Sequence, residues 1–211
     1  FIITINPDAQ VNEIDDLVYN DGDLVQIPFS SSNSGGTTTY EWTSTDPSTG
    51  MESSGVGNIE FIASNTGNSP IVTTVTVIPS FENGGISNSG NSETFTVTVN
   101  PAPQVELIQN INICAGDDIN DINFSSLNTG GTTTYEWTND NIAIGLDPNG
   151  VGDILSFTAT NNTTSAIIAT IEVTPTYENG GISNTGNPET FTITVNPGAQ
   201  VDSVADQVLC N

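Results

Sequence analysis

Residues 81–101 read FENGGISNSGNSETFTVTVNP, and residues 177–197 read YENGGISNTGNPETFTITVNP. The two segments differ at four of their 21 positions, and a loop or a half-buried strand would tolerate each difference. Their common ending returns at the start of the chain, where residues 1–7 read FIITINP. A near-duplicate of this length indicates a tandem repeat, in which each copy forms one structural unit.

The duplication divides the 211 residues into two similar parts. We predict repeat 1 at residues 8–101 and repeat 2 at residues 102–197, each long enough to bury its own core. Residues 1–7 then correspond to the last strand of a preceding repeat, and residues 198–211 to the first strand of a following one. We therefore expect the sequence to be a section of a longer array.

The charge of the chain is entirely negative. It has 25 acidic residues, no Lys, Arg or His, and a formal net charge of −25. Nucleic acid is excluded as a direct partner, because no side-chain cation can displace phosphate counterions. A polybasic contact with anionic lipid is excluded for the same reason, and no apolar run is long enough for direct membrane insertion.

The missing residue types also exclude most catalytic mechanisms. Without His there is no imidazole base, and without Lys there is no Schiff base, so Ser, Thr and Cys nucleophiles lack a partner. Glu41 and Glu136 recur once in each repeat, which a scaffold produces more readily than an active site. We predict that the chain is not an enzyme and carries no cofactor.

Apolar residues alternate with polar ones along each repeat. Phe191, Ile193 and Val195 share one face of a segment whose other face carries threonines, which is typical of a half-buried antiparallel strand. Turn sequences separate seven such segments in each repeat, which predicts tandem immunoglobulin-like β-sandwiches. The strands expected in repeat 2 are 105–113, 121–127, 133–139, 142–146, 153–160, 166–177 and 189–196.

Each repeat has one tryptophan, in the shared sequence GGTTTYEWT. Alternation places Tyr40 and Trp42 on one face of the strand and Glu41 on the other, and the same holds for Trp137. We predict that Trp42 and Trp137 are core residues packed against the opposite sheet, with the tyrosines between core and rim. The alternative is an aromatic platform that stacks on sugars.

The linker between the repeats is short and rich in proline. Residues 99–105 read VNPAPQV, and proline restricts both its own backbone and that of the residue before it. We therefore expect the orientation of one repeat to be transmitted to the next, which predicts a linear, semi-rigid rod whose main partners are neighbouring repeats.

Aspartates gather near the first turn of each repeat and could bind Ca²⁺, which prefers carboxylate and carbonyl oxygens. Their spacing does not match an EF-hand loop, so solvated loop carboxylates are the alternative. Asp15 and Asp16 lie in the same acidic region. The weak Ca²⁺ candidates are Asp21, Asp23, Asp117, Asp118 and Asp121.

Cys114 and Cys210 occupy the same position of successive repeats, where repeat 1 has Asn20. Strand lengths separate successive repeats by roughly 30 to 40 Å, too far for a disulfide, so we expect two buried strand-end thiols. A link to another chain or unit is the alternative.

Short glycosylation patterns are also present. Asp202-Ser203-Val204 matches the short Asp-Ser/Thr-apolar pattern of bacterial O-glycosylation, which makes Ser203 a candidate. Asn123, Asn161 and Asn162 begin N-glycosylation patterns.

Four motifs together resemble a known family. They are Tyr-Glu-Trp-Thr (40–43), Glu-Asn-Gly-Gly (82–85), Thr-Phe-Thr-Val-Thr-Val-Asn-Pro (94–101) and Val-Leu-Cys-Asn (208–211). The chain is similar to the PKD-like repeats of SprB-type gliding-motility adhesins, large surface proteins of Bacteroidota, although it lacks the Trp-Asp-Phe-Gly-Asp-Gly signature of PKD domains proper. The resemblance implies type IX secretion, display as filaments on the bacterial cell surface, and contact with polysaccharide or gliding machinery through other regions.

Two functions follow from these observations. The first is a structural stalk segment of a cell-surface adhesin filament, and the second is a repeated carbohydrate-binding module of a secreted protein. Buried tryptophans favour the stalk, whereas aromatic side chains exposed in a groove favour the binding module. A spacer within an extracellular enzyme is a third reading.

Overall fold

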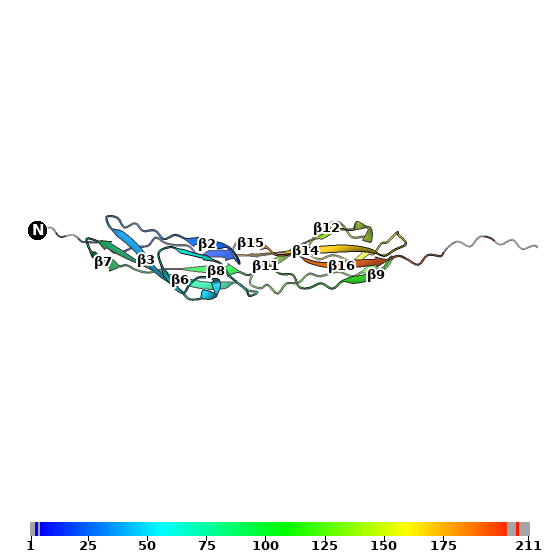
Figure 1. Ribbon diagram of the computed structural model, residues 1–211, viewed down its shortest axis with the longest axis horizontal. Helices are drawn as coiled ribbons and strands as arrows, with labels where there is room; N and C mark the ends of the chain where they lie inside the picture. Colours follow the sequence, from blue (N-terminus) through cyan, green and yellow to red (C-terminus); the bar gives the residue numbers. More distant parts are fainter. Residues whose placement is uncertain (1–2, 4, 202–205, 207–211) are drawn as a thin grey trace, which may run out of the picture. The chain divides into compact units, whose positions relative to one another are not determined.

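The structure is a computed structural model that describes residues 3, 5–201 and 206 (Figure 1). Ser203 and Cys210 lie outside the described residues. Within the described part of the chain, each repeat contains eight strands and one short 3-10 helix. The elements of repeat 1 are β1 (Leu17–Asn20), β2 (Leu24–Ile27), β3 (Thr37–Ser44), η1 (Pro47–Thr49), β4 (Ser54–Val56), β5 (Ile59–Ile62), β6 (Ile71–Asn83), β7 (Ile86–Ser89) and β8 (Glu93–Asn100).

Repeat 2 has the same order of elements. They are β9 (Ile111–Cys114), β10 (Asp118–Ile119), β11 (Thr132–Asn139), η2 (Ile142–Ile144), β12 (Asn149–Val151), β13 (Phe157–Thr158), β14 (Ile167–Asn179), β15 (Ile182–Thr185) and β16 (Glu189–Asn196).

Each repeat pairs a large sheet with a small one. In repeat 1 the large sheet has the order β1-β8-β6-β3-β4, with β7 also on β6, and the small sheet pairs β2 with β5. Repeat 2 reproduces this as β9-β16-β14-β11-β12, with β15 on β14, and a small sheet of β10 and β13. The chain therefore consists of two immunoglobulin-like β-sandwiches, as the alternating pattern predicts.

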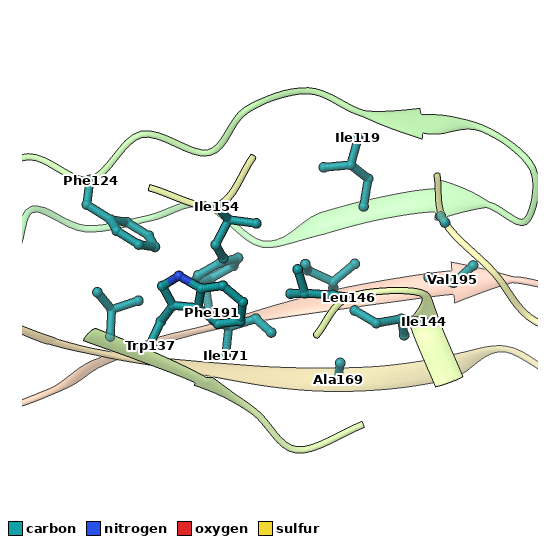
Figure 2. Packing of buried hydrophobic residues seen from close by; sticks show 13 residues of the cluster. Ile119, Phe124, Trp137, Ile144, Leu146, Ile154, Ala169, Ile171, Phe191 and Val195 are labelled. Atoms are coloured by element: carbon teal, nitrogen blue, oxygen red, sulfur yellow. The ribbon is translucent and has the colours of Figure 1, made fainter. Parts of the chain in front are cut away.

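The long central strand shows the predicted alternation over its whole length. In β6, Thr73, Val75, Val77, Pro79 and Phe81 are buried while the residues between them are partly or fully exposed. The buried side chains of the two sheets meet in one cluster per repeat. Figure 2 shows the cluster of repeat 2, where side chains from the facing layers point toward one another.

One pairing in each repeat differs from the predicted antiparallel arrangement. β1 runs parallel to β8 with Tyr19 opposite Val99, and β9 runs parallel to β16 with Ile113 opposite Val195. The remaining pairs of each large sheet whose register is given are antiparallel. Alternation has the same period in both kinds of strand, so the sequence pattern does not distinguish them.

Several predicted boundaries in repeat 2 were wrong. The expected strand 142–146 is the helix η2, because Asn141 Oδ1 accepts from Ala143 N at 3.2 Å and Gly145 closes the turn with φ 96°. The expected strand 105–113 is regular only from Ile111. The expected strand 121–127 contains only an isolated bridge between Ile122 and Ile154, and the short strand β10 precedes it. β12 and β15 lie outside all seven expected strands.

Both long hairpins close in two glycines. Gly84 and Gly85 join β6 to β7 with φ of 63° and 76°, and Gly180 and Gly181 join β14 to β15 with φ of 64° and 80°. Positive φ at both central positions defines the turn that matches the twist of paired strands, and glycine reaches it without strain. We call these turns the first hairpin and the second hairpin.

The chain forms two compact units whose limits differ from those of the repeats. Unit 1 contains Phe1–Gln104, Ser126–Thr133 and Thr176–Gly186, and unit 2 contains Val105–Ser125, Thr134–Pro175 and Asn187–Asn211. The second hairpin thus belongs to unit 1. The repeat limits 8–101 and 102–197 stay predictions.

Candidate functional site

The tryptophans, which decide between a stalk and a sugar platform, lie inside the sandwiches. Trp42 of β3 is 8% exposed and Trp137 of β11 is 7% exposed. In Figure 2, Trp137 lies beside Phe191 and Ile171, with Phe124 and Ile154 facing it from the other layer. The rings are therefore not available as a stacking platform.

A glycine on the neighbouring strand covers each indole ring. Trp42 is paired with Gly55 of β4, and a Cβ added to that glycine would lie 2.4 Å from Trp42 Cζ2. Trp137 and Gly150 repeat the arrangement at 2.3 Å. Among the described residues, neither indole Nε1 has a hydrogen-bond partner. Close packing against the glycine therefore positions each indole ring, without a hydrogen bond from Nε1.

The tyrosines stand at the border of each core. Tyr40 is half-buried against Phe29, with ring centroids 5.4 Å apart, and Tyr135 packs against Phe124 at 5.6 Å. Burial raises the pKa of the Tyr40 phenol above 10.0. Their position between core and rim agrees with the alternation in the sequence.

The aspartates proposed for Ca²⁺ serve as acceptors for nearby loops. Asp21 Oδ1 accepts from Asn65 N at 2.7 Å, and Asp23 Oδ2 accepts from Asn20 N at 2.8 Å. In repeat 2, Asp118 Oδ1 accepts from the Thr158 hydroxyl at 2.7 Å. These contacts give the carboxylates a role in the turn without any metal.

The other two candidates differ from each other. Asp121 Oδ1 accepts from Ser156 N at 2.7 Å, whereas Asp117 contributes its backbone, whose N donates to Cys114 O and whose O accepts from Ala159 N. Within the described residues, no three His, Cys, Asp or Glu side chains gather in a group that could hold a metal ion. Ca²⁺ binding stays a prediction.

Asp16 joins the outer strand β1 to the sheet. Its Oδ1 accepts from Thr96 N of β8 at 2.7 Å, and this backbone hydrogen bond holds the pKa of Asp16 below 3.8. Asn110 makes the equivalent contact in repeat 2, accepting from Thr192 N at 2.8 Å. The same bond is therefore made once by a charged acceptor and once by a neutral one.

Cys114 is exposed, and its predicted burial was wrong. Ile111 and Ile113 of β9 pack against the core cluster, so alternation turns Cys114 to the opposite face. Cys210 lies outside the described residues, as does the glycosylation candidate Ser203.

The N-glycosylation pattern at Asn161 coincides with a structural asparagine. Its side chain is 7% exposed, and Nδ2 donates to Ser165 O and Val195 O at 2.8 Å each. Asn65 makes the matching contacts in repeat 1, to Ser69 O at 2.9 Å and Val99 O at 2.7 Å. Asn161 is thus not free for modification in the folded chain.

An asparagine clamp at each hairpin was missed in the sequence. Asn6 Nδ2 donates to Asn83 O and Ile86 O of the first hairpin at 3.1 Å each. Asn100 Nδ2 donates to Asn179 O of the second hairpin at 3.1 Å, and Asn179 Nδ2 donates to Asn100 Oδ1 at 2.9 Å. The signal for it was the Asn-Pro pair at 6, 100 and 196.

Two hollows lie near these features. One of about 530 Å³ is lined by Asn6, Asn83, Gly84, Ile86 and Asn88 at the first hairpin. Another of about 300 Å³ runs along the edge of Trp42 between Glu41 and Val56. In the described part of the chain, no helix has the length and apolar character needed to cross a membrane.

Comparisons with known proteins give only distant likenesses. No protein-family model matches the chain, and no curated protein matches it. A crystal structure of Drosophila N-cadherin EC1-4 is 14% identical, with 92% of this chain and 50% of that chain covered and a TM-score of 0.46. Human protocadherin-24 EC1-2 is 13% identical, with coverage of 93% and 100% and a TM-score of 0.43.

The insect immune protein hemolin is 15% identical, with 90% of this chain and 46% of that chain covered and a TM-score of 0.36. The chain thus spans about half the length of the N-cadherin and hemolin structures. These TM-scores are too low to support an argument from similarity. The fold is therefore assigned from the strand order and pairing of the chain itself.

Proposed function

We propose that the chain is a structural stalk segment of a cell-surface adhesion filament. The observation that carries this proposal is the repeated asparagine clamp, in which the residue before each Pro7 or Pro101 bonds to the following glycine hairpin. In both clamps the asparagine Nδ2 donates to the carbonyl of the hairpin asparagine, Asn83 or Asn179, and this recurrence supports a role in joining consecutive repeats. A ligand site would require groups that the fold leaves free.

The chemistry of the remaining candidates supports the same role. Trp42 and Trp137 are in the cores, and the loop aspartates hold turns. The net charge of −25 opposes side-by-side aggregation of edge strands. The resemblance to repeats of gliding-motility adhesins extends the proposal to an extracellular location on a bacterial cell surface and to type IX secretion.

Labelling of intact cells of the source organism tests the cellular part of the proposal. Antibodies raised against the chain should bind unpermeabilised cells, and beads coated with them should move along gliding cells. Signal that requires permeabilisation would contradict the surface location, and bound but stationary beads on gliding cells would contradict the motility role.

The competing function is a carbohydrate-binding module, which the hollow beside Trp42 would have to serve. A glycan array probed with the full chain separates the two functions. We expect no glycan to bind above background, whereas binding that is lost in Glu41→Ala and Val56→Ala would favour the module. Both side chains line the hollow outside the core clusters.

A further inference from the structure

Unit 1 contains two hairpins of the same sequence in different surroundings. At the second hairpin, a Cβ added to Gly180 would lie 2.8 Å from Val18 Cγ2, and Asn20 Nδ2 donates to Ser183 O at 3.3 Å. At the first hairpin, a Cβ on Gly84 would have no atom of the described residues within 4 Å. The end of β1 therefore covers the second hairpin, and no segment within residues 3, 5–201 and 206 takes its place at the first.

The apolar residue after each turn shows the same difference. Ile86 follows the first turn and is 68% exposed, whereas Ile182 follows the second turn and is half-buried. An isoleucine held this far in water at the tip of an ordered hairpin loses most of the free energy that its burial would contribute. The first hairpin thus exposes an isoleucine at a position that is partly covered in the second hairpin.

A second pair of matching positions repeats the contrast. Thr129 N donates to Asn68 O at 2.8 Å, and a Cβ on the neighbouring Gly130 would lie 2.8 Å from Pro70 Cδ. Gly35 is the equivalent of Gly130 in repeat 1, and in the described part of the chain a Cβ there would have no atom within 4 Å. Two separate segments, the β1 end and the 68–70 loop, cover the second hairpin side of unit 1.

The backbone of the uncovered turn matches that of the covered one. The glycines of the two turns differ in φ by only a few degrees, and both turns are held by the asparagine clamp. The hollow of about 530 Å³ bordered by Gly84 and Ile86 lies beside the first hairpin. Docking there would therefore need little rearrangement of the backbone.

We propose that the first hairpin surface, formed by Gly35, Gly84, Ile86 and Ser87, docks the β1 end and the β5–β6 loop of another repeat of this type. The occupant would place a β-branched side chain against Gly84, an amide on Ser87 O and a proline loop against Gly35. The segments that cover the second hairpin are uncharged at the contact points, which suits a chain whose carboxylates repel one another.

Two glycine variants of the 211-residue chain test the contact between Gly180 and Val18. Gly180→Ala and Gly84→Ala impose the same left-handed backbone strain, since φ is 64° and 63°, but only Gly180→Ala meets Val18. We expect the larger fall in melting temperature for Gly180→Ala, and Val18→Ala should narrow the gap. Equal effects of the two glycine variants would remove the basis of the proposal.

A chain with an added repeat tests the docking surface itself. A second copy of residues 8–94 placed before Phe1 uses residues 1–7 as its own last strand, because they match residues 95–101. Cys114→Asn and Cys210→Asn leave Ile86→Cys as the single thiol. We expect this thiol to react about tenfold more slowly in the extended chain, since labelling then needs local opening.

Two further variants keep this test decisive. Val18→Ala together with Pro70→Ala, made only in the added copy, should restore fast labelling of Ile86→Cys, while Ile182→Cys reports the covered state. Far-ultraviolet circular dichroism establishes that the added repeat is folded. Equal labelling rates with and without a folded added repeat would overturn the proposal, as would slow labelling that the two variants leave unchanged.

Discussion

Trp42 gives the clearest link between one residue and the function of the chain. Its ring fills the core of repeat 1 and lies against Gly55, so its contribution is packing. We expect Trp42→Ala to lower the free energy of unfolding by about 3–5 kcal/mol, measured by chemical denaturation. Val56 is 77% exposed and lines the hollow beside Trp42. Val56→Ala should change the free energy of unfolding by less than about 0.5 kcal/mol. An unchanged stability in Trp42→Ala would contradict the core assignment.

Asp16 predicts a dependence of stability on pH. Because its pKa is lowered in the folded state, Asp16 stabilises the fold above pH 3.8, and this contribution is lost as pH falls through the lower folded pKa. Asp16→Asn removes the titration but keeps the acceptor, as Asn110 shows in repeat 2. We expect the melting temperature of the variant to fall less steeply below about pH 4 than that of the parent chain.

Asp15→Asn removes the same charge one residue away and serves as the control. Melting curves between pH 2 and pH 7 should show a flatter acid limb for Asp16→Asn than for Asp15→Asn. Identical profiles for the two variants would mean that loss of charge alone, and not the bond to Thr96, sets the effect.

At the scale of elements, β4 is held to β3 by a contact that only glycine allows. A Cβ on Gly55 would lie 2.4 Å from the Trp42 ring, and the position has no positive φ that would add strain of its own. We expect Gly55→Ala to destabilise repeat 1 by about 1–3 kcal/mol, as overpacking usually does. Thermal unfolding measures this destabilisation, and Ser54→Ala on the same strand is the control. If Gly55→Ala destabilises the chain no more than Ser54→Ala does, the predicted clash with Trp42 is wrong.

The loop between β5 and β6 is tied to β8 by Asn65. Besides donating to Ser69 O and Val99 O, its Oδ1 accepts from Gly67 N at 2.9 Å, and the side chain is 2% exposed. Asn65→Ala leaves the Val99 carbonyl without this donor, so we expect a loss of about 1–3 kcal/mol. Urea unfolding compares it with Thr66→Ala, a change at an exposed neighbour that should have little effect. Similar values for both would show that the buried amide is dispensable.

For the molecule as a whole, charge dominates the expected response to solution conditions. A chain with a net charge of −25 and no cationic side chain repels itself, and salt screens this repulsion over about 8 Å at physiological ionic strength. We expect the melting temperature to rise when NaCl is added to a low-salt buffer. A midpoint that falls as salt rises would contradict the repulsion account.

The same measurement addresses the Ca²⁺ candidates. CaCl₂ and NaCl are compared at equal ionic strength, and an effect of screening alone predicts equal melting temperatures. A larger rise with CaCl₂ that disappears in Asp21→Asn with Asp23→Asn would indicate a site in repeat 1. An equal rise would leave the aspartates as the loop acceptors that their hydrogen bonds already describe.

Much of the sandwich could be predicted because its strands carry a simple period. The alternation in β6, β8, β14 and β16 places the buried side chains correctly, and the glycine pairs mark both hairpins. Short elements were predicted poorly. β10 has two residues and β12 has three, too few to show any period, β13 occupies only two residues of the expected strand 153–160, and η2 depends on one capping asparagine.

The sequence by itself determined the duplication, the faces of the long strands, and the absence of bases and cations from the chemistry of the chain. These follow from local order and composition, which do not depend on how the chain folds. Only the tertiary structure decided the parallel pairing of β1 with β8, the packing of Trp42 against Gly55, and the hydrogen bonds from Asn100 to the second hairpin. Such contacts join residues far apart in the chain, and no local period records which of them will meet.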